Sequence, residues 1–150
     1  MKSFPTPLAL LLVVAALLAG CGGPSTTTVG LKIELAGVAR QSDGRAQVTW
    51  RVVNPNIVPY LLARVSHRIY LDGVLVGTLD DREALAIPSQ ANQERTAALV
   101  SAGPAAERAL AAAAATGSAA YRVESNVVVR LYGETTEKGE LRGAGTVPVK

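Results

Sequence analysis

Alternation of apolar and polar residues is the dominant pattern of the chain from residue 31 onward. Apolar side chains recur at every second position in Leu31–Leu35 and Val48–Val52, and at most of the second positions in Val65–Leu71. A period of two residues places successive side chains on opposite faces of an extended strand. Each of these segments is therefore predicted to be a half-buried β-strand with one face on the core.

Turn signals separate these strands. Gln41–Gly44 contains the Asp-Gly pair of a turn, and Asn54-Pro55-Asn56 ends the second strand because proline cannot donate a hydrogen bond to a ladder. Asp72-Gly73 lies between two apolar runs and predicts a tight hairpin leading into Val74–Gly77. Residues 77–86 are predicted to form a loop or an irregular crossing, and residues 87–88 to begin another extended stretch.

The pattern changes after residue 100. Gln93–Val100 is predicted to be a strand, and the alanine-rich segment 104–116 a helix, with Pro104 at its first position and Gly117 just past its end. The competing interpretation of this segment is a low-complexity linker. If the segment is a helix, the narrow face that packs on the sheet would consist of Leu110 with Ala106, Ala113 and Ala114.

The final third of the chain returns to alternation. Tyr121–Tyr132 is the longest strand pattern, 133–139 is polar and turn-like, and Thr146–Lys150 supplies a short last strand. About seven short strands and one inserted helix predict a mostly β protein. We expect a single antiparallel β-sandwich, immunoglobulin- or fibronectin-III-like, over residues 29–150.

The N-terminal segment differs from the rest of the chain. Leu8–Ala19 is an unbroken apolar run of 12 residues preceded by Lys2. A membrane-spanning helix needs about 20 residues, so this run is typical of a secretory signal peptide. It ends in Leu18-Ala19-Gly20-Cys21, which closely resembles the lipobox of bacterial lipoproteins. The competing interpretation is an ordinary signal peptide in which the cysteine occurs by chance.

The lipobox resemblance implies a defined processing. Residues 1–20 would be a signal peptide cleaved between Gly20 and Cys21, and the Cys21 thiol would carry a diacylglycerol thioether. Two or three acyl chains anchor a protein stably where one is marginal. Residues 21–28 would form the lipidated N-terminus and a flexible tether. No aspartate follows Cys21, so we expect an envelope protein at the outer membrane, facing the periplasm.

Composition narrows the chemistry that the chain can perform. Apolar residues make up 49% and charged residues 18%, with a net charge of +3. A single cysteine excludes an intramolecular disulfide and a multi-cysteine metal site, and a single histidine excludes a histidine-rich metal centre. Because basic residues are spread along the chain, nucleic acid is not an expected partner. We expect no cofactor and no metal.

The segment from Trp50 to Gly77 resembles the type 2 late embryogenesis abundant proteins, which share the water-stress and hypersensitive-response (WHy) domain. The residues that carry the resemblance are Val52, Asn54-Pro55-Asn56, Leu61-Leu62, Tyr70, Asp72-Gly73 and Gly77. The later extended segment, helix and long strand follow the order of the family. The resemblance covers residues 29–150 and implies a sandwich with one helix, a role in desiccation or other stress, and no catalytic residues.

The remaining candidate residues each have two interpretations. Asn54, Pro55 and Asn56 form a structural turn or contact a ligand, and we favour the turn because Pro55 holds Asn54 extended. His67 is the only candidate general base near neutral pH, and we favour a histidine packed in a strand. Neither Ser66 nor Ser89 lies in a nucleophile-elbow motif.

Two charged groups of residues could bind ions. Residues 80–83 are a loop that could hold a cation weakly, but they lack the ladder of ligands of a calcium loop. A basic stripe would form if the strands that carry four arginines were neighbours: Arg64, Arg68, Arg122 and Arg130. We favour a solvated loop for the first and the polar face of an antiparallel sheet for the second.

Together these observations predict a non-enzymatic, lipid-anchored envelope protein that protects or binds envelope proteins or the membrane. Two alternatives remain. One is an adaptor of an envelope complex, in which the edge strand Thr146–Lys150 pairs with a protein partner. The other is a protein that binds a small molecule or a lipid between the sheet and the helix.

Overall fold

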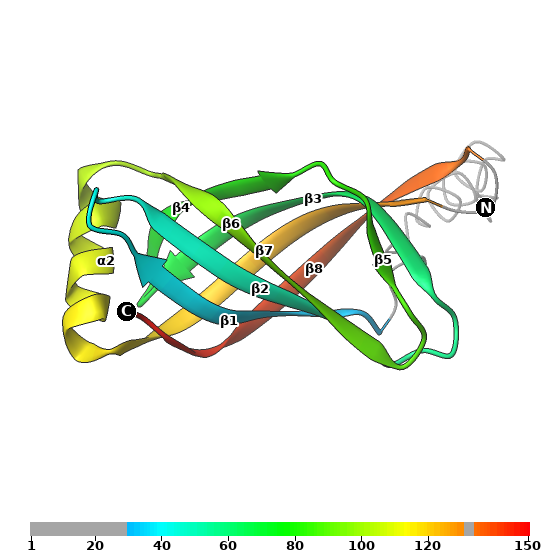
Figure 1. The fold of residues 1–150 in the computed structure, drawn as a ribbon, viewed down its shortest axis with the longest axis horizontal. Coiled ribbons are helices and arrows are strands. Elements are labelled where there is room, and N and C mark those ends of the chain that lie inside the picture. Colours follow the sequence, from blue (N-terminus) through cyan, green and yellow to red (C-terminus); the bar gives the residue numbers. More distant parts are fainter. Residues whose placement is uncertain (1–29, 131–133) are drawn as a thin grey trace, which may run out of the picture.

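A computed structural model describes residues 30–130 and 134–150. The predicted signal peptide, the cleavage site at Gly20 and Cys21, and the predicted tether lie outside the described residues. The described residues form eight strands and one helix (Figure 1). In chain order they are β1 (Lys32–Arg40), β2 (Ala46–Asn54), β3 (Tyr60–Leu71), β4 (Val74–Asp81), β5 (Leu85–Ile87), β6 (Ala91–Ser101), α2 (Pro104–Thr116), β7 (Ser118–Arg130) and β8 (Thr136–Pro148).

The strands form two layers of antiparallel neighbours. One layer has the order β1-β2-β6, and the other has the order β4-β3-β7-β8, with β5 beside the start of β3. The layers are joined on one side by a short pairing of β4 with β6. On the other side Val38 forms a parallel bridge with Val149, and Lys150 exchanges backbone hydrogen bonds with Val38 and Arg40. The predicted mostly β, antiparallel sandwich class is confirmed, and the sandwich is nearly a closed barrel.

The core lies between the two layers and follows the predicted alternation. In β2, Val48, Trp50 and Val52 are completely buried, and the residues between them are half-buried. Facing them from the other layer are buried residues of β3 and β7, including Ile69 and Val123. Side chains with a period of two thus build both walls of one core.

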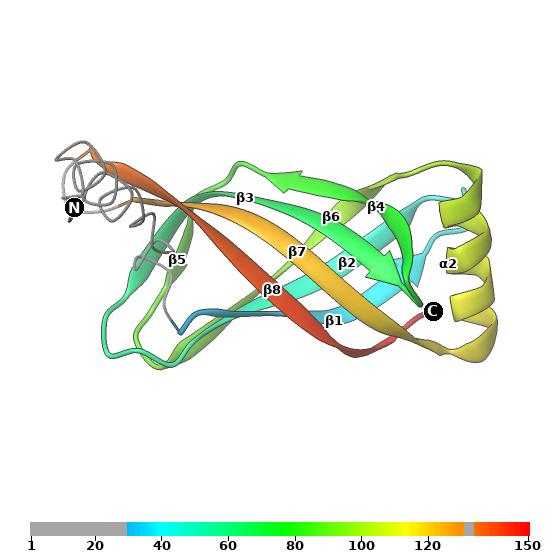
Figure 2. The same ribbon diagram turned by 180° about the vertical axis from the view of Figure 1, so that it is seen from behind.

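The helix α2 closes one end of the sandwich, and the two views in Figures 1 and 2 agree on its place. Pro104 is its first residue, and Gly117 ends it in the left-handed conformation (φ 78°), as predicted from the sequence. Ala106, Leu110 and Ala113 are buried, and Ala114 packs partly against the core. The helix interpretation of the alanine-rich segment is therefore confirmed, together with its predicted packing face.

The prediction of a loop over residues 77–86 was wrong for much of that segment. β4 continues to Asp81, and β5 begins at Leu85, so the described residues hold eight strands where about seven were expected. Charged side chains obscured the strand pattern here. Asp80 lies on the exposed face of β4 and is held by Arg64 of β3, which is a cross-strand pair of opposite charges.

The end of the chain is also more regular than predicted. Instead of a turn at 133–139 and a short strand from Thr146, β8 pairs with β7 over its whole length from Thr136 to Pro148. Glycines lowered its strand propensity, but one of them is required by packing. β1 crosses β8 so closely at Gly143 that a Cβ there would overlap the carbonyl oxygen of Ile33.

Candidate functional site

The end of the sandwich opposite α2 is where the described chain begins. Figures 1 and 2 show the start of β1, the connection between β2 and β3, and β5 together at this end. The connection is residues 55–59, here called the Pro55–Pro59 loop. A Cβ built on Gly30 would lie 3.1 Å from Oδ1 of Asn56, so the chain enters the domain directly beside this loop. We call this region the entry end.

Asn54 organises the entry end from a buried position. Its side chain is 1% exposed, and its Nδ2 donates hydrogen bonds to the carbonyl oxygens of Val58 (2.8 Å) and Pro88 (2.9 Å). Its Oδ1 accepts a hydrogen bond from the backbone N–H of Asn56 (3.0 Å). One amide therefore ties the loop to itself and to the segment that follows β5, as a structural turn requires.

The Pro55–Pro59 loop exposes two large apolar side chains. Ile57 is 81% exposed and Val58 is 53% exposed, although a fourth hydrogen bond, from the backbone N–H of Gln90 to the carbonyl of Asn56, also holds the loop. The sequence interpretation favoured a turn over ligand contact at Asn54–Asn56 and did not identify Ile57 and Val58. The sequence did hold a signal for them: an apolar pair lies between two prolines, and a segment with two prolines is not expected to form a buried strand.

Replacement of Asn54 tests its role in holding the loop. We expect Asn54→Ala to lower the free energy of unfolding by about 2 kcal/mol, because two carbonyls and one N–H lose their hydrogen bonds to a buried amide. Asn92→Ala removes the same side chain from an exposed position on β6 and should change stability by less than about 0.5 kcal/mol. Urea denaturation of both variants measures the difference. Equal stabilities would show that the Asn54 hydrogen bonds contribute nothing net.

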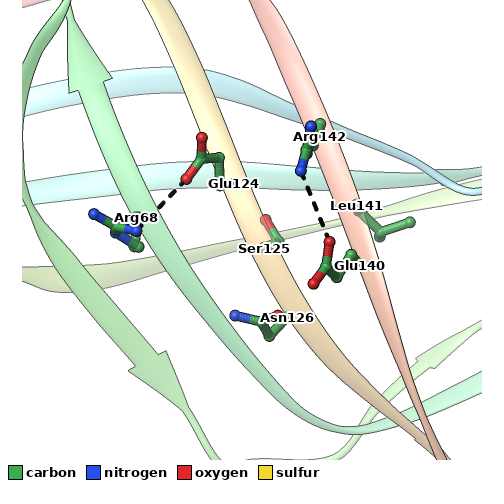
Figure 3. A pocket seen from close by; sticks show the side chains of 7 residues that line it. All are labelled: Arg68, Glu124, Ser125, Asn126, Glu140, Leu141 and Arg142. Carbon is green, nitrogen blue, oxygen red and sulfur yellow. Dashed lines mark ion pairs between the residues drawn. The ribbon is translucent and has the colours of Figure 1, made fainter.

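A polar groove lies on the outer face of β3, β7 and β8 (Figure 3). It has a volume of about 170 Å³, and its lining residues are Arg68, Glu124, Ser125, Asn126, Glu140, Leu141 and Arg142. Arg68 faces Glu124 at 3.9 Å, and Arg142 faces Glu140 at the same distance. Each positive charge in the groove therefore has a carboxylate beside it, which leaves no net charge to attract an ionic ligand.

Three of the four arginines of the predicted basic stripe, Arg64, Arg68 and Arg122, are likewise accompanied by acids, and Arg130 is exposed at the end of β7. Arg64 forms two hydrogen bonds with Asp80, at 2.7 and 2.8 Å. Arg122 pairs with Glu124 and lies over the ring of Tyr70, with the guanidinium carbon 3.8 Å from the ring centroid. This arrangement favours the polar sheet face over an anion-binding stripe.

The acidic segment 80–83 is an ion-pair network. Arg64 and then Arg82 hold the pKa of Asp80 at about 2 by hydrogen bonding, well below the ordinary value. Arg95 contacts the carboxylates of Asp81 and Glu83, each at 3.1 Å. Residues 30–130 and 134–150 contain no group of three or more metal-ligating side chains that could hold a metal ion. The carboxylates of this segment are thus engaged by arginines.

His67 lies in the core, as the strand alternation indicates. It is 1% exposed, its Nδ1 is 2.7 Å from Oγ of Ser125, and its ring packs edge-on against Trp50 with 4.6 Å between centroids. Nε2 has no hydrogen-bond partner. Burial lowers the pKa of His67 to about 4, against a smaller opposing effect of Asp81. The imidazole is thus neutral near pH 7 and enclosed, which favours a histidine packed in a strand.

The edge proposed for a partner strand is already occupied. Val149 and Lys150 pair with β1 through the bridge to Val38 and the hydrogen bonds of Lys150. Within the described part of the chain, none of the helices has the length and apolar character required to cross a membrane.

Comparisons with known proteins connect this fold to solved structures. No protein-family model matches the chain, and a search of curated proteins gave no match. The solution structure of AT1g01470 from Arabidopsis thaliana has a TM-score of 0.50 and 12% identity, covering 79% of this chain and 78% of that one. This likeness shows a shared fold.

Two further solved structures are similar at lower scores. A solution structure described as that of a late embryogenesis abundant (LEA) protein has a TM-score of 0.45 and 10% identity, covering 95% of this chain and 87% of that one. A crystal structure of a protein from Archaeoglobus fulgidus has a TM-score of 0.46 and 14% identity, covering 81% and 96%.

Proposed function

We propose that this chain is a lipid-anchored protein of the bacterial envelope, whose LEA type 2 domain protects the membrane or neighbouring envelope proteins during drying or osmotic stress. The observation that carries the proposal is Leu18-Ala19-Gly20-Cys21 at the end of an apolar run of signal-peptide length. The domain that follows resembles the WHy domain in sequence. The fold that the chain shares with the solved structure of AT1g01470 is compatible with that resemblance.

The described side chains are consistent with a role that needs no chemistry. The histidine is enclosed in the core, and three of the four candidate arginines and the carboxylates of residues 80–83 form ion pairs. A protective or binding role instead uses the surface of the domain and its place beside the membrane. Cys21 would therefore fix where the domain acts, and other enzymes would carry out the lipidation.

The adaptor alternative receives less support than protection. Within its proposed edge at Thr146–Lys150, Val149 and Lys150 already pair with β1, so a partner strand would have to displace β1 there. The alternative of a ligand between the sheet and the helix also receives less support, because the face of α2 that would line such a site is packed. Ala106, Leu110 and Ala113 on this face are at most 3% exposed.

A deletion strain that is complemented either with the wild-type gene or with a Cys21→Ala gene tests anchoring and protection together. We expect the wild-type gene to restore survival after drying and to give a membrane-associated protein whose mass includes the diacylglycerol. We expect Cys21→Ala to give an unlipidated protein that leaves the membrane fraction or keeps its signal peptide, and to restore survival poorly. Mass spectrometry, fractionation and colony counts provide the three measurements.

The readouts separate the two parts of the proposal. Unchanged membrane fractionation of Cys21→Ala, with no mass difference from wild type, would refute lipidation. A deletion strain that tolerates drying and osmotic stress as well as its parent would refute the protective role, whatever the result for lipidation.

A further inference from the structure

The Pro55–Pro59 loop presents an apolar surface that the fold does not use. Four large apolar side chains are exposed among the described residues, and only Ile57 and Val58 are neighbours in one loop. No residue of the loop carries a charge. Single exposed apolar residues are ordinary, but an adjacent pair in one loop indicates a surface that contacts another molecule or a membrane.

The loop is held in place rather than merely exposed. The Asn54 amide binds the carbonyls of Val58 and Pro88, and the N–H of Gln90 binds the carbonyl of Asn56. The two prolines restrict φ at both ends of the loop. Little conformational entropy remains to be lost when Ile57 and Val58 contact another surface, which favours binding.

The position of the loop indicates that this contact is with a membrane. The chain enters the domain at Gly30, whose nearest neighbour from another part of the chain is the side chain of Asn56. Cys21 precedes Gly30 by nine residues, which span at most about 30 Å when fully extended. A bilayer that holds the Cys21 lipid is therefore within reach of this end, whereas α2 lies at the opposite end (Figures 1 and 2).

We propose that Ile57 and Val58 insert into the interfacial region of the bilayer to which Cys21 is anchored, so that the domain sits with its entry end on the membrane. This inference rests on the proposed lipidation and adds an orientation to it. Apolar side chains of peripheral proteins penetrate the boundary between headgroups and acyl chains by about 5–10 Å. The lipid on Cys21 supplies the affinity for the membrane, and the loop determines which end of the domain faces the bilayer.

The test uses the lipidated protein in vesicles of phosphatidylethanolamine and phosphatidylglycerol, with and without lipids brominated on the acyl chains. Ile57→Trp places a fluorophore at the loop, and Val100→Trp places one at a matched control position. Val100 is 68% exposed and lies near the end of β6, three residues before the cap of α2. The only native tryptophan, Trp50, is completely buried, and its signal is subtracted using the parent protein.

We expect brominated lipid to reduce the added emission of Ile57→Trp roughly by half, and that of Val100→Trp by less than about a tenth. Equal quenching at the two positions in a lipidated protein would overturn the orientation and leave anchoring intact. A purified protein whose mass lacks the lipid would refute the proposed anchoring, and the orientation that depends on it with it. The mass measurement therefore distinguishes the two failures.

Discussion

Gly143→Ala is expected to destabilise the protein by about 3 kcal/mol or more, because overpacking a tight contact forces the backbone to move. β1 passes over β8 at this residue, and an added Cβ would overlap the carbonyl oxygen of Ile33. Backbone atoms cannot turn aside as a flexible side chain can, so β1 must shift. The shift would weaken the closure of the sandwich on its β1–β8 side.

Gly37→Ala is the matched control for this prediction. Gly37 is also a strand glycine, at the bulge of β1, but a Cβ there would meet no atom within 4 Å. We expect its stability to stay within about 0.5 kcal/mol of wild type. Guanidinium denaturation of both variants provides the measurement. A Gly143→Ala protein as stable as Gly37→Ala would show that β1 and β8 do not approach closely in solution.

Acidification is expected to remove about 3 kcal/mol of stability through His67 alone, because its pKa falls from 6.5 to about 4 on folding. The sign follows from proton binding. Between these two pKa values the unfolded chain binds the proton and the folded chain does not, so stability falls as the pH falls. The contribution is fully present above pH 6.5 and is lost progressively down to about pH 4.

Comparison of wild type with His67→Gln isolates this contribution. Denaturation midpoints measured from pH 7 to pH 4 should decline more steeply for wild type, since glutamine has no proton to gain. The carboxylate of Asp80, whose pKa is held at about 2, titrates below this window and contributes equally to both proteins. Parallel pH profiles for the two proteins would show that His67 titrates as an exposed histidine does.

The local sequence predicts the fold well where one face of a strand is buried. β2 and β3 show apolar alternation, and the Asp72-Gly73 signal correctly places a two-residue hairpin between Leu71 and Val74. The pattern fails in β4 and β8 for different reasons. In β4 the exposed face carries ion-paired charges, and in β8 a glycine serves a contact with β1 that no local pattern encodes.

The candidate site is only partly visible in the sequence. The residues around Asn54 can be recognised as a turn, because proline stops a strand and asparagine bonds to nearby backbone. The partner of Asn54 at Pro88 lies 34 residues away, so the bond requires the tertiary fold. The contact of Gly30 with Asn56 also joins distant parts of the chain. The cluster of ion pairs around Arg95 also depends on strand register, which short motifs do not fix.

The bridge between Val38 and Val149 has a consequence for how the chain reaches its native state. These residues are about 110 positions apart, and their pairing completes the side of the sandwich where β1 meets β8. Contacts of such long sequence separation form slowly, because a large loop must be closed before they stabilise anything. β1 leaves a ribosome or an export channel early, but its outer edge stays uncovered until the last strand arrives. During that interval β1 is a template for intermolecular pairing, so the time between the emergence of β1 and the closure of the sandwich sets the risk of aggregation.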